Sequence, residues 1–205
     1  MAQLSIARAL LAAGLGLGTS SAALADEQPS VLTGASSSML AETCNGCHGT
    51  NGASAGPATP TIAGLSEDYF VDLMNGFASG EVYSTIMGRI AKGYSEEEIK
   101  QLAKHFGTKP FVAAKQDFDD SQVKKGQKLH DKYCEKCHAD GGTSAEDDAG
   151  VLAGQWTPYL TWTLADFRAG DREMTKKMKK KVEQMLAKEG DAGIQALLNY
   201  YASQQ

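Results

Sequence analysis

The chain has 205 residues, of which 42% are hydrophobic and 22% charged, and its formal net charge at pH 7 is −5. These values are typical of a folded globular protein and exclude a wholly disordered chain. The acidic balance argues against nucleic acid as a partner. Only four cysteines are present, which excludes a small scaffold held together mainly by disulfides.

The segment 1–25 has the composition of a secretory signal peptide. Its one charged side chain, Arg8, precedes an apolar run, and the segment ends in Ala23-Leu24-Ala25. Small residues at these positions are typical of a cleavage site, which we expect after Ala25. The apolar run is too short to cross a bilayer, which takes about 20 apolar residues. We therefore expect an exported protein with no membrane span.

All four cysteines lie in two copies of one five-residue pattern, Cys-x-x-Cys-His, at residues 44–48 and 134–138. In this pattern the two thiols can bond covalently to the two vinyl groups of one haem, and the adjacent histidine can bind its iron. The pattern therefore predicts two covalently attached haems c. The attachment residues are Cys44, Cys47, Cys134 and Cys137, and the residues for the iron are His48 and His138.

Other uses of paired cysteines explain the pattern less well. Cysteines of exported proteins often form disulfides, but that would not require a histidine after each pair. A redox-active dithiol of the thioredoxin type needs a βαβ context, which the sequence lacks. Half of a zinc site would not need a histidine next to the second cysteine in both copies.

The two patterns belong to an internal repeat. Counted from the histidine of each pattern, four positions have the same residue type in both copies, and aligning them needs no gap. Such a fixed period indicates a duplicated structural unit. The sequence therefore predicts two haem domains, at residues 26–112 and 113–205, joined near Pro110. The matched pairs are Gly64 and Gly154, Tyr69 and Tyr159, Phe77 and Phe167, and Gly80 and Gly170.

Both copies are predicted to be helical. In the first copy we expect a helix over Ser37–Gly46, a glycine-rich loop over 52–64, and helices that start after Ser66 and Ser95. A serine followed by acidic residues is typical of a helix start. In the second copy a helix over Gln122–Lys136 is expected to end at the second cysteine pattern. No run alternates long enough to form a strand, so the predicted fold class is all-α.

Each iron needs a second axial ligand or an open face, and a methionine sulfur would close the iron and raise its reduction potential. Met87 lies well after His48 in the sequence, beyond the loop at Gly80. It is the predicted iron ligand of the first copy. Met74 lies among apolar residues of a helix, where methionine more often fills the core. The remaining histidines, His105 and His130, are predicted to be structural or surface residues.

The second copy offers three methionines, Met174, Met178 and Met185, at helical spacings that are typical of a core-facing side. The interval from His138 to Met178 is the nearest to that from His48 to Met87, and differs from it by a single position. Met178 is therefore the predicted iron ligand of the second copy. Met174 stays open as the alternative.

The order of these features resembles the class I cytochromes c, here in tandem as in bacterial dihaem cytochromes. The segments 59–65 and 86–95 resemble more closely the cytochrome subunit of flavocytochrome c sulfide dehydrogenase. This resemblance covers the chain after residue 25. It implies a periplasmic complex in which a separate FAD-bearing subunit oxidises sulfide. This chain would accept the electrons and pass them to a soluble cytochrome c.

The resemblance also implies that each axial histidine donates a hydrogen bond to a proline carbonyl in the following loop. Pro57 lies in the loop after His48 and would take this role, whereas Asp147 stands at the equivalent position of the second copy. We therefore expect the two haems to differ in environment and in reduction potential.

The sequence provides no catalytic residues for sulfide oxidation. No cysteine is left over as a nucleophile, and no Gly-x-Gly-x-x-Gly fingerprint follows a strand. Two other functions stay open, a free dihaem carrier that serves a terminal oxidase and a self-contained dihaem oxidoreductase such as a peroxidase. Whether the lysine-rich segment at residues 176–181 docks a partner also stays open.

Overall fold

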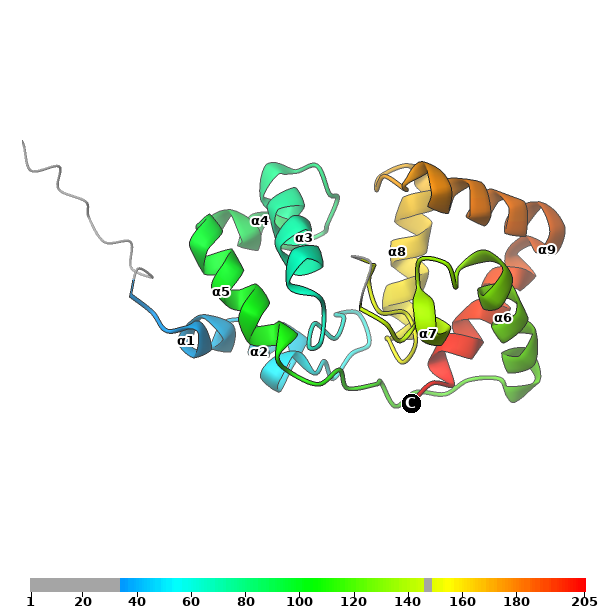
Figure 1. The fold of residues 1–205 in the computed structure, drawn as a ribbon, viewed down its shortest axis with the longest axis horizontal. Coiled ribbons are helices and arrows are strands. Elements are labelled where there is room, and N and C mark those ends of the chain that lie inside the picture. Colours follow the sequence, from blue (N-terminus) through cyan, green and yellow to red (C-terminus); the bar gives the residue numbers. More distant parts are fainter. Residues whose placement is uncertain (1–33, 146–148) are drawn as a thin grey trace, which may run out of the picture. The chain divides into compact units, whose positions relative to one another are not determined.

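Helices form the regular structure in this computed structural model, which describes residues 34–145 and 149–205 (Figure 1). The predicted signal peptide at residues 1–25 lies outside the described residues. None of the described helices is both long and apolar enough to span a bilayer. No strand occurs in the described ranges, which confirms the predicted all-α class.

The first copy begins at a short helix whose end differs from the prediction. The Thr43 hydroxyl donates to the carbonyl of Leu40 at 2.6 Å, so the helix stops at Glu42 instead of continuing to Gly46. Ser66 and Ser95 cap the helices predicted after them. The elements are α1 (Ser37–Glu42), α2 (Asn45–His48), η1 (Thr50–Gly52), α3 (Glu67–Ser79), α4 (Met87–Ile90), η2 (Ala91–Gly93) and α5 (Glu96–Gly107).

The second copy repeats this order in outline, although its cysteine pattern forms turns where the first copy has α2. A single long helix, α9, stands where the first copy has α4, η2 and α5, and its backbone breaks at Gly190, where φ is +59°. The first helix of this copy stops at Tyr133, before the predicted end at Lys136. The elements are α6 (Asp120–Tyr133), α7 (Ala139–Gly142), α8 (Thr157–Ala169) and α9 (Lys176–Ala202).

Two glycines show that the repeat extends to the backbone. Gly64 and Gly154 both have φ of +73°, a conformation that glycine adopts most readily. The N–H of Gly64 donates to the carbonyl of Phe106 at 2.9 Å, and that of Gly154 donates to the carbonyl of Tyr201 at 2.8 Å. The same loop is therefore tied to the last helix in each copy.

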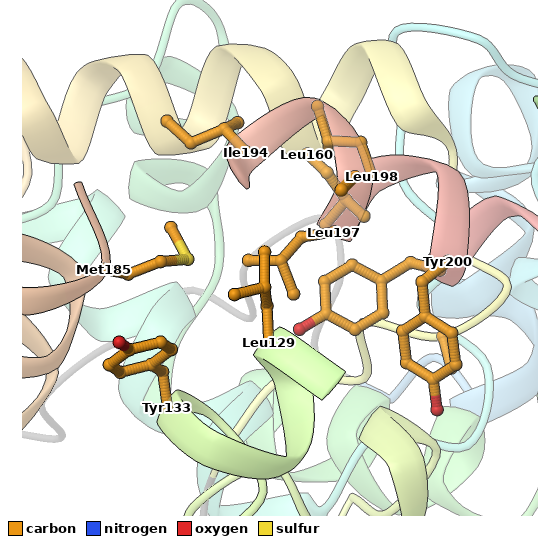
Figure 2. Packing of buried hydrophobic residues seen from close by; sticks show 11 residues of the cluster. Leu129, Tyr133, Leu160, Met185, Ile194, Leu197, Leu198 and Tyr200 are labelled. Carbon is orange, nitrogen blue, oxygen red and sulfur yellow. The ribbon is translucent and has the colours of Figure 1, made fainter. Parts of the chain in front are cut away.

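The core of the second copy forms where α6 packs against α9, with one contribution from α8 (Figure 2). The crossing is close at Gly126, where an added Cβ would lie 2.0 Å from the carbonyl oxygen of Ala196 and 2.6 Å from the Cβ of Tyr200. Only a residue without a side chain fits there. The labelled core residues are Leu129, Tyr133, Leu160, Met185, Ile194, Leu197, Leu198 and Tyr200.

We predict that Gly126→Ala destabilises the protein by about 1–3 kcal/mol, because the added methyl group forces α6 away from α9. Gly93→Ala is the matched control, since a Cβ at Gly93 meets no atom within 4 Å. Denaturant unfolding followed by circular dichroism measures both. Equal stability of the two variants would contradict the close crossing of α6 and α9.

Candidate haem sites

The cysteines of the first copy lie on one helical turn. The N–H groups of Cys47 and His48 donate to the carbonyl of Cys44 at 3.2 and 2.8 Å. Residues three apart share one face of a helix, so both thiols lie on the same side of the chain, with the histidine directly after them. Both cysteines are free, and His48 is buried.

The second copy reproduces this geometry at the end of α6. The N–H groups of Cys137 and His138 each donate to the carbonyl of Cys134 at 3.0 Å, and both cysteines are again free. Burial raises the pKa of the thiols of Cys44 and Cys134. A reactive dithiol needs a lowered thiol pKa, so these raised values argue against dithiol exchange.

Both histidine rings are fixed by a hydrogen bond from Nδ1. His48 donates to the carbonyl of Pro60 at 2.9 Å, and His138 donates to the carbonyl of Gly150 at 3.2 Å. Burial lowers the pKa of both rings, which favours the neutral imidazole. With the proton on Nδ1, the lone pair of Nε2 is left to bind a metal, as expected of an axial histidine.

The prediction that Pro57 accepts this bond was wrong. The Ser54 hydroxyl donates to the carbonyl of Thr59 at 2.7 Å and accepts the N–H of Gly56 at 2.9 Å, which closes residues 54–59 into a loop. Pro57 lies inside that loop, and the chain returns to the histidine only at Pro60. Asp147, the residue compared with Pro57 in the second copy, lies outside the described residues.

Pro60 and Gly150 were not predicted as the acceptors, although the sequence contains a signal for them. Each is separated from its histidine by the same interval along the chain, so the repeat itself could have identified the pair. The second copy still lacks a proline at this position. The two sites therefore differ at the acceptor of the histidine proton, by residue and by hydrogen-bond length.

The predicted ligand Met87 is the first residue of α4 and is half-buried. Two apolar side chains beside it, Ile86 and Ile90, are 53% and 39% exposed. Exposed isoleucines next to a methionine suit a segment that packs on a large apolar ring. Met74 is buried in the core of the first copy, as predicted.

The structure separates the three methionines of the second copy. Met185 points into the core between α6 and α9 (Figure 2) and is 2% exposed. Met178 and Met174 are both half-buried near the start of α9. The cap of this helix lies between them, because the N–H of Met178 donates to the hydroxyl of Thr175 at 3.2 Å. Both therefore remain candidates, with Met178 inside the helix and Met174 before it.

The remaining histidines have other environments. His130 is fully buried, and its two ring nitrogens lie 3.0 Å from the hydroxyl of Tyr201 and 2.6 Å from the carboxylate of Glu135. Both nitrogens are thus engaged by the protein. His105 packs edge-on against Phe106, with ring centroids 5.2 Å apart.

A hydrogen-bonded contact links the two copies directly behind the first histidine. The N–H of Thr61, the residue after Pro60, donates to the side-chain oxygen of Gln155 at 2.9 Å, and the amide nitrogen of Gln155 donates to the carbonyl of Thr61 at 3.0 Å. Both residues are buried. Trp156 adds a bond from its indole N–H to the carbonyl of Ser54 at 3.1 Å.

The donor set fits haem c. Each copy presents two free thiols on one side of a turn, a buried or half-buried histidine with a free Nε2 lone pair, and at least one half-buried methionine on a later segment. Two thioether bonds and two axial ligands to one iron require this combination. The pattern predicted from the sequence and the local geometry therefore agree.

Comparison with known proteins also relates the chain to cytochromes. No protein-family model matches the chain. It is 41% identical over 106 residues to the cytochrome subunit of sulfide dehydrogenase from Chlorobaculum tepidum, covering 51% of this chain and 93% of that protein. It is 26% identical over 143 residues to a thiosulfate dehydrogenase electron acceptor from Thiomonas intermedia, covering 64% and 65%.

The fold matches the crystal structure of reduced recombinant cytochrome c4 from Pseudomonas stutzeri with a TM-score of 0.68 and 23% identity, covering 81% of this chain and 96% of that one. The likeness supports the fold of two tandem cytochrome c domains. The chain therefore belongs to the family of the cytochrome subunit of sulfide dehydrogenase, has the fold of two tandem class I cytochrome c domains, and is an electron-transfer protein that binds haem c.

Proposed function

We propose that this chain is the periplasmic dihaem subunit of a sulfide dehydrogenase, which accepts electrons from an FAD-bearing subunit and passes them to a soluble cytochrome c. The observation that carries the proposal is the 41% identity that extends over 93% of the cytochrome subunit from Chlorobaculum tepidum. Cleavage after Ala25 would release the mature chain. The domains would then span 26–112 and 113–205.

The proposed ligand set assigns one haem to each copy. Cys44 and Cys47 would hold the first haem, and His48 and Met87 would bind its iron. Cys134 and Cys137 would hold the second haem, and His138 and Met178 would bind its iron. When bound, each haem supplies a one-electron iron couple.

The protein side chains set the conditions for electron transfer. The Nδ1 hydrogen bonds hold each histidine ring in one orientation, so little rearrangement accompanies a change of charge. A methionine sulfur bound to the iron would favour the reduced form and keep substrates away from it. No flavin fingerprint occurs in the sequence, so oxidation of sulfide belongs to the partner.

A free dihaem carrier is the second candidate. It is favoured by the similarity to a protein described as a thiosulfate dehydrogenase electron acceptor, although at only 26% identity. Such a protein would receive electrons from another enzyme without forming a stable complex with a flavoprotein.

We predict that Cys44→Ala/Cys47→Ala and Cys134→Ala/Cys137→Ala each remove one covalent haem. Each double variant lacks both thioether bonds of one copy and keeps those of the other. The pyridine haemochrome assay and the mass of the intact protein should give two haems for the wild type and one for each variant. An unchanged haem content in either variant would refute the assignment of that pair.

We predict that Met87→Ala and Met178→Ala each remove the sulfur–iron charge-transfer band of one haem and lower its reduction potential, because a sulfur ligand stabilises the reduced iron. Met39→Leu is the control, since Met39 is exposed. Absorption spectra and redox titration measure both effects. Loss of the second band in Met174→Ala instead would transfer that role to Met174.

We predict that the native protein copurifies with a stoichiometric FAD protein and that sulfide reduces its haems only in that complex. The isolated chain should stay oxidised with sulfide at the same concentration, because it has no flavin site. Reduction by thiosulfate plus a thiosulfate dehydrogenase, without any flavoprotein, would favour the free carrier instead.

A further inference from the structure

Arg172 is a buried arginine that lies between equivalent aromatic residues of the two copies. Its side chain follows the end of α8 and is only 9% exposed. The guanidinium carbon lies 5.4 Å from the ring centroid of Phe167 and 5.8 Å from that of Phe77. Both phenylalanines stand at the same interval after the histidine of their copy. The guanidinium of Arg172 therefore lies beside equivalent phenylalanines of both copies.

Arg172 has no carboxylate partner in the parts of the chain that the structure describes. The ion pairs found there join Lys125 to Glu189, His130 to Glu135, and Arg168 to Asp191. The backbone of Arg172 donates to the carbonyl of Asp166, but no hydrogen bond of the guanidinium is found within residues 34–145 and 149–205. A buried cation without a counter-charge carries a large desolvation cost.

Two tyrosines share this environment. Tyr69 and Tyr159 also stand at matching intervals after the histidines of their copies. Burial, with Tyr159 nearby, raises the pKa of Tyr69 to about 12, and the charge of Arg172 acts in the opposite direction. Tyr69 is therefore within electrostatic reach of both Tyr159 and Arg172. Neither phenol hydroxyl has a hydrogen-bond partner among the described residues, so the cluster offers a cation and two O–H groups but no anion.

A carboxylate is the group best suited to pair with the Arg172 guanidinium. Arginine and tyrosine donate to carboxylates, and arginine can do so with two parallel bonds. Each haem carries two propionate carboxylates on the side of the ring away from its thioether bonds. We propose that Arg172 is a shared counter-charge for propionates of both haems, with Tyr69 and Tyr159 donating to the same groups.

Only the second copy has an arginine at this position of the repeat. The equivalent residue of the first copy is Val82, which stands as far after His48 as Arg172 does after His138. Val82 and Arg172 occupy the same kind of turn, because their N–H groups donate to the carbonyls of the equivalent residues Gly76 and Asp166 at 3.0 and 3.3 Å. One copy thus provides the cation for both haems, which is a positioning and charge role for Arg172.

The proposal rests on the proposed function, since it requires two haems. A cation close to both irons disfavours the oxidised form, which carries one more positive charge than the reduced form. Removal of the charge should therefore lower both reduction potentials. A change confined to packing against Phe77 and Phe167 would not move both potentials in the same direction by similar amounts.

The test compares Arg172→Met, Arg172→Lys and the control Arg168→Met in the holoprotein. Arg168 lies in the last turn of α8, close to Arg172 in the sequence, but is half-exposed and pairs with Asp191 at 3.0 Å. Spectroelectrochemical titration should show that Arg172→Met reduces the ratio of reduced to oxidised haem about tenfold at a fixed potential for both haems, which is about 59 mV. Arg172→Lys should shift both less, and Arg168→Met should match the wild type.

The haem content of each protein is measured first. A wild type with fewer than two haems would refute the proposed function itself. With two haems present, a shift no larger than that of Arg168→Met, a shift of one haem only, or equal shifts for Met and Lys would overturn the role of Arg172 alone.

If Arg172→Met does not fold, resonance Raman spectra of Arg172→Lys keep the proposal testable. The propionate bending bands of both haems should move from their wild-type frequencies, because the planar guanidinium that holds the carboxylates is replaced. Unmoved bands would overturn the proposal.

Discussion

The hydrogen bond from each axial histidine to a backbone carbonyl in the following loop is the constraint on which the sites depend. It fixes the tautomer and the plane of the ring, and so decides which nitrogen can face a metal. The loop that carries the carbonyl is held in turn by a second set of bonds. The carbonyl of Gly52 accepts the N–H groups of Ile62 and Ala63, and Gly142 does the same in the second copy. Attachment and ligation thus rely on a whole loop beyond the five-residue pattern.

The sequence allowed prediction of the features that depend on short spacings. The cysteine patterns, the repeat and the serine caps at Ser66 and Ser95 were all predicted, because each depends on a local pattern of residue types. The acceptor of the His48 proton was not, because the Ser54 hydroxyl closes a loop whose size no local rule gives. The choice between Met174 and Met178 also stayed open, because both are half-buried and they lie on either side of the helix cap at Thr175.

Contacts between the copies were beyond the reach of sequence reasoning. Arg172 reads as one of several basic residues until Phe77, from the other copy, is found beside it. Likewise Gln155 has no distinctive pattern around it. Such pairings depend on how two separate helical units meet, and no periodicity within either unit encodes that.

The two copies share the loop geometry around the histidine but differ in the polarity of equivalent buried residues. Leu40 of the first copy corresponds to His130 of the second, and Phe106 corresponds to Tyr201. Where the first copy has two apolar residues, the second has a hydrogen-bonded pair that also engages Glu135, inside the cysteine pattern. Buried polar networks of this kind are costly unless every member is satisfied. The second site therefore has a more polar surrounding than the first.

The paired hydrogen bonds between Gln155 and Thr61 have a mechanical consequence. Thr61 is covalently joined to Pro60, whose carbonyl holds the first histidine, so one short backbone segment serves both the joint between the copies and the ligand of the iron. A substitution that loosened the joint would also disturb the ligand. The orientation of the first histidine and the packing of the two copies are therefore mechanically coupled through this one segment.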